Sequence, residues 1–131
     1  MKKKILDICL LISKNSINLH PRKGNYKHFS FIIQSHQLVE WGTNRANPPL
    51  IKFGYENHQM IHSENLAYKR GKGLLDKNKK FEVVNIRLNR SKQVKISKPC
   101  SHCLEYLKKM GCSNIWFTDK IGDFKKINLN K

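Results

Sequence analysis

Hydrophobic and polar residues alternate along several segments of the chain, and this alternation predicts β-strands. The first such segment is KHFSFIIQS (27–35), and HQLVEWGTNR (36–45) follows it at the distance expected of an antiparallel hairpin partner. FEVVNIRLN (81–89) predicts a third strand, and NIWFTDKIGDFKKINLN (114–130) predicts two more strands separated by a turn. The residues that share one face of the first and third strands are Phe29, Phe31, Ile33 and Val84, Ile86, Leu88.

Helical spacing of apolar residues predicts three helices. In the first, the residues that recur at this spacing are Ile5, Ile8, Cys9 and Ile12. The second starts at His62 and meets no helix breaker before Gly71. The third, CSHCLEYLKKMG (100–111), has Pro99 at its start and Gly111 at its end, where these residue types are favoured.

The predicted element order is therefore α-β-β-α-β-α-β-β, which indicates an α/β fold with helices packed on a sheet. The segments 17–26 and 46–60 contain Pro and Gly and predict loops, whereas 71–80 predicts an exposed, strongly basic connection. A length of 131 residues is sufficient for one hydrophobic core, so we expect a single domain over residues 1–131.

The chain carries a formal net charge of +17, which favours polyanionic partners and nucleic acid above all. However, 21 of its 26 basic residues are Lys and only 5 are Arg, although Arg is the residue most suited to bidentate phosphate and base contacts. Lysine faces that serve only to contact solvent remain the alternative explanation of the charge.

No stretch of the sequence approaches the ~18 apolar residues of a membrane span. The start, MKKKILDICLLISKN, is similar to a signal peptide, but Asp7 interrupts its apolar stretch and no small-residue cleavage site follows. We therefore expect a cytoplasmic protein without membrane partners. In a reducing compartment, a pair of cysteines is more typical of metal binding or catalysis than of a disulfide.

Such a pair occurs in KPCSHC, where Cys100 and Cys103 begin the third helix. Residues three apart on a helix have β-carbons roughly 5–6 Å apart on one side, and a helix N-terminus favours thiolate over thiol. This geometry suits two zinc ligands. A thioredoxin-like redox pair is the competing explanation, but it would follow the first strand of a βαβ unit near the N-terminus.

A catalytic zinc ion needs three protein ligands and one open position. His102, between the two cysteines, faces another side of the helix, and His20, His28 and His36 have no acidic residue nearby in the sequence. His62 differs, because it starts the second predicted helix and is followed by Glu64 two residues later. We expect the starts of two helices to converge on one ion.

His62-Ser63-Glu64 followed by Pro99-Cys100-Ser101-His102-Cys103 resembles the zinc signature of the cytidine deaminase superfamily, H-x-E and P-C-x-x-C. The resemblance extends over most of the chain and implies a three-layer fold, with helices on both faces of a central mixed five-stranded sheet. The closing segment 114–130 favours an antiparallel hairpin for the last two strands, as in the free-cytidine branch of the superfamily.

The resemblance also implies the roles of the site residues. His62, Cys100 and Cys103 would hold Zn²⁺, and Glu64 would transfer the proton of an activated water to the ring nitrogen and the leaving amino group. Asn44, in EWGTNR, corresponds to a residue that contacts the sugar or the base, with a plain turn residue as the alternative. Backbone groups around Ser63 would orient the base, whereas no role is implied for Cys9 or Cys112.

The substrate is less constrained. The charge and the basic segments 71–80 and 90–98, which we expect to flank the site, favour deamination of cytosine, rather than adenine, in single-stranded DNA or RNA, as do aromatic residues that could stack on bases. Small size favours free cytidine or deoxycytidylate as the alternative. A non-catalytic, zinc-stabilised nucleic-acid-binding module is a second alternative, although such a module would not need Glu64. Homo-oligomers are common in this superfamily, and the sequence leaves that point open.

Overall fold

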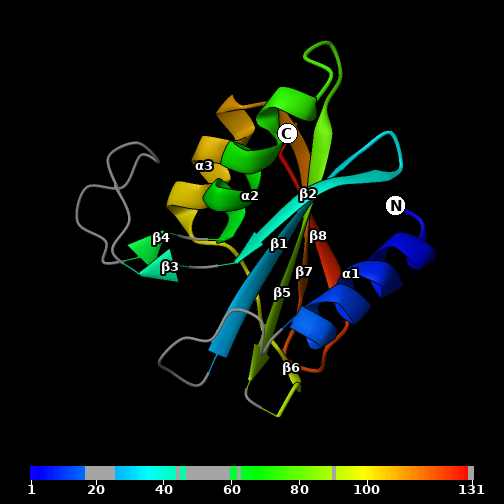
Figure 1. Ribbon diagram of the computed structural model, residues 1–131, viewed down its shortest axis with the longest axis vertical. Helices are drawn as coiled ribbons and strands as arrows, with labels where there is room; N and C mark the ends of the chain where they lie inside the picture. Colours follow the sequence, from blue (N-terminus) through cyan, green and yellow to red (C-terminus); the bar gives the residue numbers. More distant parts are fainter. Residues whose placement is uncertain (17–25, 44, 47–59, 62, 90, 130–131) are drawn as a thin grey trace.

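A computed structural model of the chain describes residues 1–16, 26–43, 45–46, 60–61, 63–89 and 91–129 (Figure 1). Asn44 and His62, two of the predicted site residues, lie outside these ranges, as do nearly all residues of the predicted loops 17–26 and 46–60. The elements in chain order are α1 (Lys3–Ser16), β1 (Tyr26–Gln34), β2 (Gln37–Thr43), β3 (Arg45–Ala46), β4 (Met60–Ile61), α2 (Ser63–Gly71), the 3-10 turn η2 (Lys72–Leu74), β5 (Phe81–Asn89), β6 (Val94–Lys95), α3 (Ser101–Lys109), β7 (Cys112–Thr118) and β8 (Phe124–Asn128).

The main sheet is mixed and has the strand order β2-β1-β5-β7-β8, which confirms the predicted α/β fold and its five principal strands. β1 pairs antiparallel with both β2 and β5, β5 and β7 are parallel, and β7 and β8 form the predicted antiparallel hairpin. Three short strands were not predicted. β3 and β4 pair with each other, and β6 pairs with the end of β5 at Arg87 and Leu88.

Helices cover both faces of this sheet, with α1 on one side and α2 and α3 together on the other (Figure 1). The strand residues predicted to share a face do so. Phe29, Phe31 and Ile33 of β1 and Val84, Ile86 and Leu88 of β5 form one buried cluster with Leu6 and Cys9 of α1. A second cluster under α2 and α3 contains Ile32, Val83, Ala67 and Leu107. The sheet therefore separates two cores, as the three-layer prediction requires.

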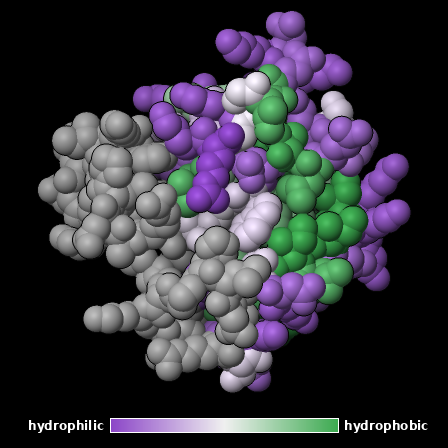
Figure 2. All heavy atoms as spheres, viewed as in Figure 1, coloured by the Kyte–Doolittle hydropathy of each residue, from purple (hydrophilic) through white to green (hydrophobic). Residues whose placement is uncertain are grey.

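The inward face of α1 differs from the predicted one at Ile8. The buried positions of α1 are Leu6, Cys9, Ser13 and Ser16, whereas Ile8 is 40% and Leu11 59% exposed. Apolar residues occur almost all round this helix, so spacing alone did not reveal which stripe would contact the sheet. Figure 2 shows apolar side chains gathered on the side of the molecule that carries α1.

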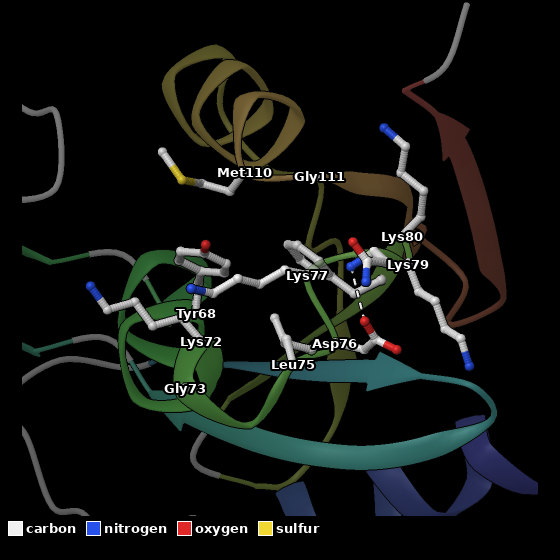
Figure 3. Close-up of a pocket in the computed structure, with 12 residues that line it drawn as sticks. Tyr68, Lys72, Gly73, Leu75, Asp76, Lys77, Lys79, Lys80, Met110 and Gly111 are labelled. Carbon is white, nitrogen blue, oxygen red and sulfur yellow. Dashed lines mark hydrogen bonds between the residues drawn. The ribbon is translucent and has the colours of Figure 1, made fainter.

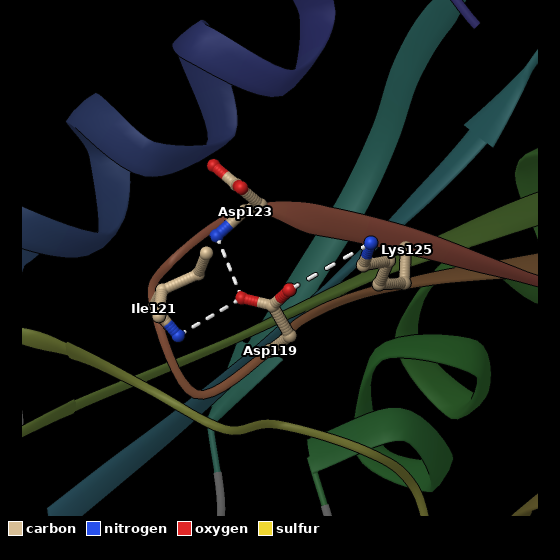
Figure 4. A network of polar contacts seen from close by, with 4 residues as sticks. All are labelled: Asp119, Ile121, Asp123 and Lys125. Atoms are coloured by element: carbon tan, nitrogen blue, oxygen red, sulfur yellow. Dashed lines mark hydrogen bonds and ion pairs between the residues drawn. The ribbon is translucent and has the colours of Figure 1, made fainter.

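Two tight turns fix the hairpins at the edges of the sheet. Ser35 and His36, between β1 and β2, both have positive φ, at 52° and 62°, as a two-residue turn matched to strand twist requires. Between β7 and β8, Asp119 Oδ1 accepts hydrogen bonds from the backbone N–H groups of Ile121 and Asp123, at 3.0 and 2.9 Å (Figure 4). Gly122 supplies the positive φ of this turn.

None of the helices among the described residues has the length and apolar character needed to cross a membrane.

Candidate active site

The described site residues lie at the N-terminal ends of α2 and α3. Each helix leads into one of the two parallel neighbours β5 and β7, whose first residues Phe81 and Cys112 are paired. Both helices therefore end near the N-terminal ends of β5 and β7 and begin near the C-terminal ends of these strands. They also contact each other, through the edge-to-face rings of Tyr68 and Tyr106, whose centroids are 6.0 Å apart. This topology brings Glu64 and the cysteine pair to the same side of the molecule, at the C-terminal ends of β5 and β7.

The cysteine pair has the geometry of two zinc ligands. Cys100 is the N-cap residue of α3 and is partly exposed, whereas Cys103, in the first turn, is fully buried. Their Sγ atoms are 3.5 Å apart and are not joined in a disulfide. Two Zn–S bonds of about 2.3 Å at a tetrahedral angle place their sulfur atoms about 3.8 Å apart. The two thiols thus fit one edge of a tetrahedral zinc site.

The structure leaves the complete ligand set untested. Among the described residues, no three His, Cys, Asp or Glu side chains form a group that could hold a metal ion. The third predicted ligand, His62, is outside those residues, so the site remains a prediction built on the cysteine pair and on the resemblance. His102 is exposed on α3, whereas Cys103, its neighbour, points inward.

Glu64 lies in the first turn of α2 and is only 5% exposed. Its Oε1 accepts a hydrogen bond from Ser63 Oγ at 3.2 Å, and Ser63 Oγ also lies 2.7 Å from Ser30 Oγ in β1. A buried carboxylate on α2, the helix that packs beside the cysteine-bearing helix, is a suitable proton carrier. The Ser63 side chain is engaged by these two neighbours. The predicted contact with a substrate uses backbone groups around Ser63, so it does not compete with these hydrogen bonds.

The two remaining cysteines have another environment. Cys9 lies in the core under α1, on the face of the sheet opposite α2 and α3, and Cys112 is buried at the start of β7. Burial raises the pKa of each of these thiols to about 12. Both therefore stay protonated at neutral pH.

A cavity of about 520 Å³ lies at the other ends of α2 and α3 (Figure 3). It is lined by Tyr68 and Phe81, whose rings stack at 5.5 Å, and by Met110, Leu75 and four lysines of the segment 71–80. The lysine side chains spread apart in Figure 3 and do not converge on one point. Segment 71–80 therefore lies away from Glu64 and the cysteine pair and does not flank the site, contrary to the prediction.

Sequence reasoning missed the buried polar residues beneath the site. Ser30 and Asn85 occupy cross-strand positions of β1 and β5 and point to the face that α2 and α3 cover. The alternation along the strand does indicate that Ser30 points to the face opposite to that of its neighbours Phe29 and Phe31. In an isolated sequence such a polar position is read as solvent-facing, and only the packing of α2 on β1 shows that it is buried.

No family model matches the chain, and no curated protein matches its sequence. Its structure is similar to that of a cytidine deaminase from Burkholderia pseudomallei, with a TM-score of 0.68 and 14% identity, over 99% of this chain and 94% of that chain. It is also similar to a dCMP deaminase from the cyanophage S-TIM5, in complex with dCMP and dUMP. That match has a TM-score of 0.60 and 12% identity, over 92% of this chain and 85% of the other. A cytidine deaminase from Mycobacterium leprae matches with a TM-score of 0.58 and 12% identity, over 92% of both chains. These identities are low, so the likeness is one of fold.

Proposed function

Because the chain has the cytidine deaminase fold, we propose that it is a zinc-dependent hydrolytic deaminase that converts cytosine to uracil in a nucleoside or nucleotide. The observation that carries the proposal is the joint placement of a buried Glu64 and a cysteine pair with 3.5 Å between its sulfur atoms, at the starts of two parallel helices.

His62, Cys100 and Cys103 would hold the zinc ion, which when bound supplies a nucleophile from water near neutral pH. Thiolates and imidazole are the ligands that zinc prefers, and three protein ligands leave a position open. Cys103 is fully buried and Cys100 is partly exposed. One of the two sulfur ligands would therefore be fixed within the core, while the other would leave the metal site accessible from solvent.

Glu64 would take the proton of the attacking water and deliver it to the ring nitrogen, then assist departure of the amino group. The reaction balances as cytosine plus water giving uracil plus ammonia. Burial of Glu64 limits its contact with bulk water, so a proton that it takes up passes to the bound base. Asn44 would hydrogen-bond the sugar or the base, and backbone groups near Ser63 would orient the ring.

Free cytidine or deoxycytidylate is the substrate that we now place first. The net charge and the basic segments favoured nucleic acid, but the similar structures are those of cytidine and dCMP deaminases, one of them in complex with dCMP and dUMP. The basic segment 71–80 also lies away from the site. A single-stranded nucleic acid stays the second candidate because of the net charge of +17.

The test is a comparison of substrates with zinc-loaded protein, in which uracil and ammonia formation are measured with cytidine, dCMP, single-stranded DNA, RNA and duplex DNA. Adenosine is tested as a substrate in the same assay, with inosine formation as the measurement of adenine deamination. We expect turnover of cytidine or dCMP, and turnover about 10²- to 10⁴-fold slower in Glu64→Gln prepared in parallel. Turnover of single-stranded DNA or RNA alone would transfer the proposal to the polynucleotide. Zinc binding without any deamination would support the non-catalytic module instead.

A further inference from the structure

A chain of buried hydrogen bonds runs beneath the candidate site. Ser63 Oγ contacts Ser30 Oγ at 2.7 Å, and Ser30 Oγ donates to Asn85 Oδ1 at 2.6 Å. A hydroxyl group has one proton, so Ser30 uses its own on Asn85, and the Ser63 proton is divided between Ser30 and Glu64. The conformation of Ser63 therefore depends on Ser30 as well as on Glu64.

The same chain continues to the segment that precedes the cysteine pair. Asn85 Nδ2 donates to Ser97 O at 3.5 Å, and Ser97 Oγ donates to Asn85 O at 2.9 Å. Ser97 Oγ also lies 2.7 Å from Thr118 Oγ1, and Thr118 Oγ1 donates to Lys95 O at 2.6 Å. Ser97 stands three residues before Cys100, with the buried Pro99 between them.

The side chains that form this hydrogen-bond path are shielded from water. Ser30 and Thr118 are 0% exposed, and the largest exposed fraction among Ser63, Asn85 and Ser97 is 4%. Buried polar groups cost free energy unless they are hydrogen-bonded, and apolar residues would fill most such positions. A continuous polar path across the three strands β1, β5 and β7, beneath the helices α2 and α3, calls for a reason other than core packing.

We infer that Ser30, Asn85 and Ser97 are positioning residues that hold the two ligand-bearing segments of the site in register. Ser63, at one end of the path, directly follows His62, and Ser97, at the other end, leads into Cys100. The inference rests on the proposed zinc site. Outer hydrogen-bond partners of metal ligands fix the orientation of those ligands, and removing one lowers metal affinity or activity about 10- to 100-fold.

The experiment measures zinc affinity of the full chain by competition with a chromophoric chelator, which needs no turnover. Ser30→Ala and Ser97→Ala should each bind zinc about 10- to 100-fold more weakly than the parent. Ser30→Thr, which restores a hydroxyl, should recover most of that loss. The matched control is Ser13→Ala, because Ser13 is also 0% exposed and donates to Cys9 O at 2.9 Å, but on the face that α1 covers.

Parent zinc affinity in Ser30→Ala, or an equal loss in Ser13→Ala, would overturn the inference. In the double variant Ser30→Ala/Ser97→Ala, a combined loss smaller than the product of the single losses supports one connected path, and a full product contradicts it. Thr118→Val, which keeps the shape of its side chain, replaces Ser97→Ala if that variant does not fold. If the parent deaminates no substrate, the proposed function fails, while zinc affinity still decides this inference.

Discussion

Gly42 of β2 lies directly against Ala67 of α2, since a Cβ atom on Gly42 would come within 2.9 Å of Ala67 N and 3.3 Å of Ala67 Cα. This distance is shorter than side-chain carbons accept, and the neighbouring atoms are backbone atoms that cannot rotate away. The helix that carries Glu64 therefore packs on the sheet through a position without a side chain.

Gly42→Ala should consequently push α2 away from β2 and lower the free energy of unfolding by about 1–3 kcal/mol. Urea denaturation followed by circular dichroism measures the change. Gly73→Ala is the matched control, because nothing lies within 4 Å of a Cβ atom at Gly73, and this variant should be neutral or slightly more stable. Equal stability of the two variants would contradict the close contact.

Glu64→Gln should bind zinc as the parent does and lose deaminase activity by about 10²- to 10⁴-fold, the range that proton transfer by a positioned side chain contributes. Glutamine keeps the shape of glutamate, and its Oε1 can still accept the hydrogen bond from Ser63. Metal analysis and initial rates with saturating substrate are the two measurements. Deamination at the parent rate would remove Glu64 from the proposed mechanism.

Cys103→Ala should lose zinc and the stability that zinc binding adds to the folded state. Its melting temperature should match that of the chelator-treated parent and should no longer rise when zinc is added. Cys112→Ala provides the control, since Cys112 is equally buried but lies at the start of β7. If Cys103→Ala keeps full zinc occupancy, Cys103 is not a ligand.

Above pH 9, the stability of the protein should fall in part because of Cys9 and Cys112. Burial raises the pKa of each thiol from 9.0 to about 12. Below pH 9 both states are protonated, whereas between pH 9 and 12 only the unfolded state ionises and is thereby favoured. Each thiol contributes up to about 1.4 kcal/mol per pH unit to this loss. Urea denaturation at pH 8 and 10 measures the slope, and Cys9→Ala/Cys112→Ala should make it shallower. An unchanged slope in that variant would exclude the two thiols.

Most of the fold could be predicted because the apolar residues follow regular periods. FEVVNIRLN was predicted and observed over the same residues, and the predicted start and end signals of α3, Pro99 and Gly111, agree with the observed helix. The exposed Ile8 shows the limit of this reasoning, since a helix that is apolar on several sides has no unique inward face. The short strands β3, β4 and β6 have two residues each, too few for a periodic pattern.

Much less of the site could be predicted from residue types alone. The spacing of Cys100 and Cys103 is local, so the sequence indicated their proximity, and the structure places their sulfur atoms 3.5 Å apart. Ser30 and Asn85 are 55 positions apart, and their contact arises only when β1 and β5 pair in register. Segment 71–80 was predicted to flank the site but follows the opposite end of α2. The direction of α2 follows from its packing on the sheet, which the local sequence does not reveal.

The parallel pairing of β5 with β7 has a consequence for the order of folding events. The hairpins β1–β2 and β7–β8 join residues that are close in the chain, whereas β1–β5 and β5–β7 pair residues that are far apart in it. β5 and β7 can pair only after the whole segment that contains α3 has crossed over the sheet. Contacts that close long segments form slowly. Since the cysteine pair lies on this crossing segment, we expect metal capture to follow sheet closure during refolding, so that zinc uptake reports one of the last steps.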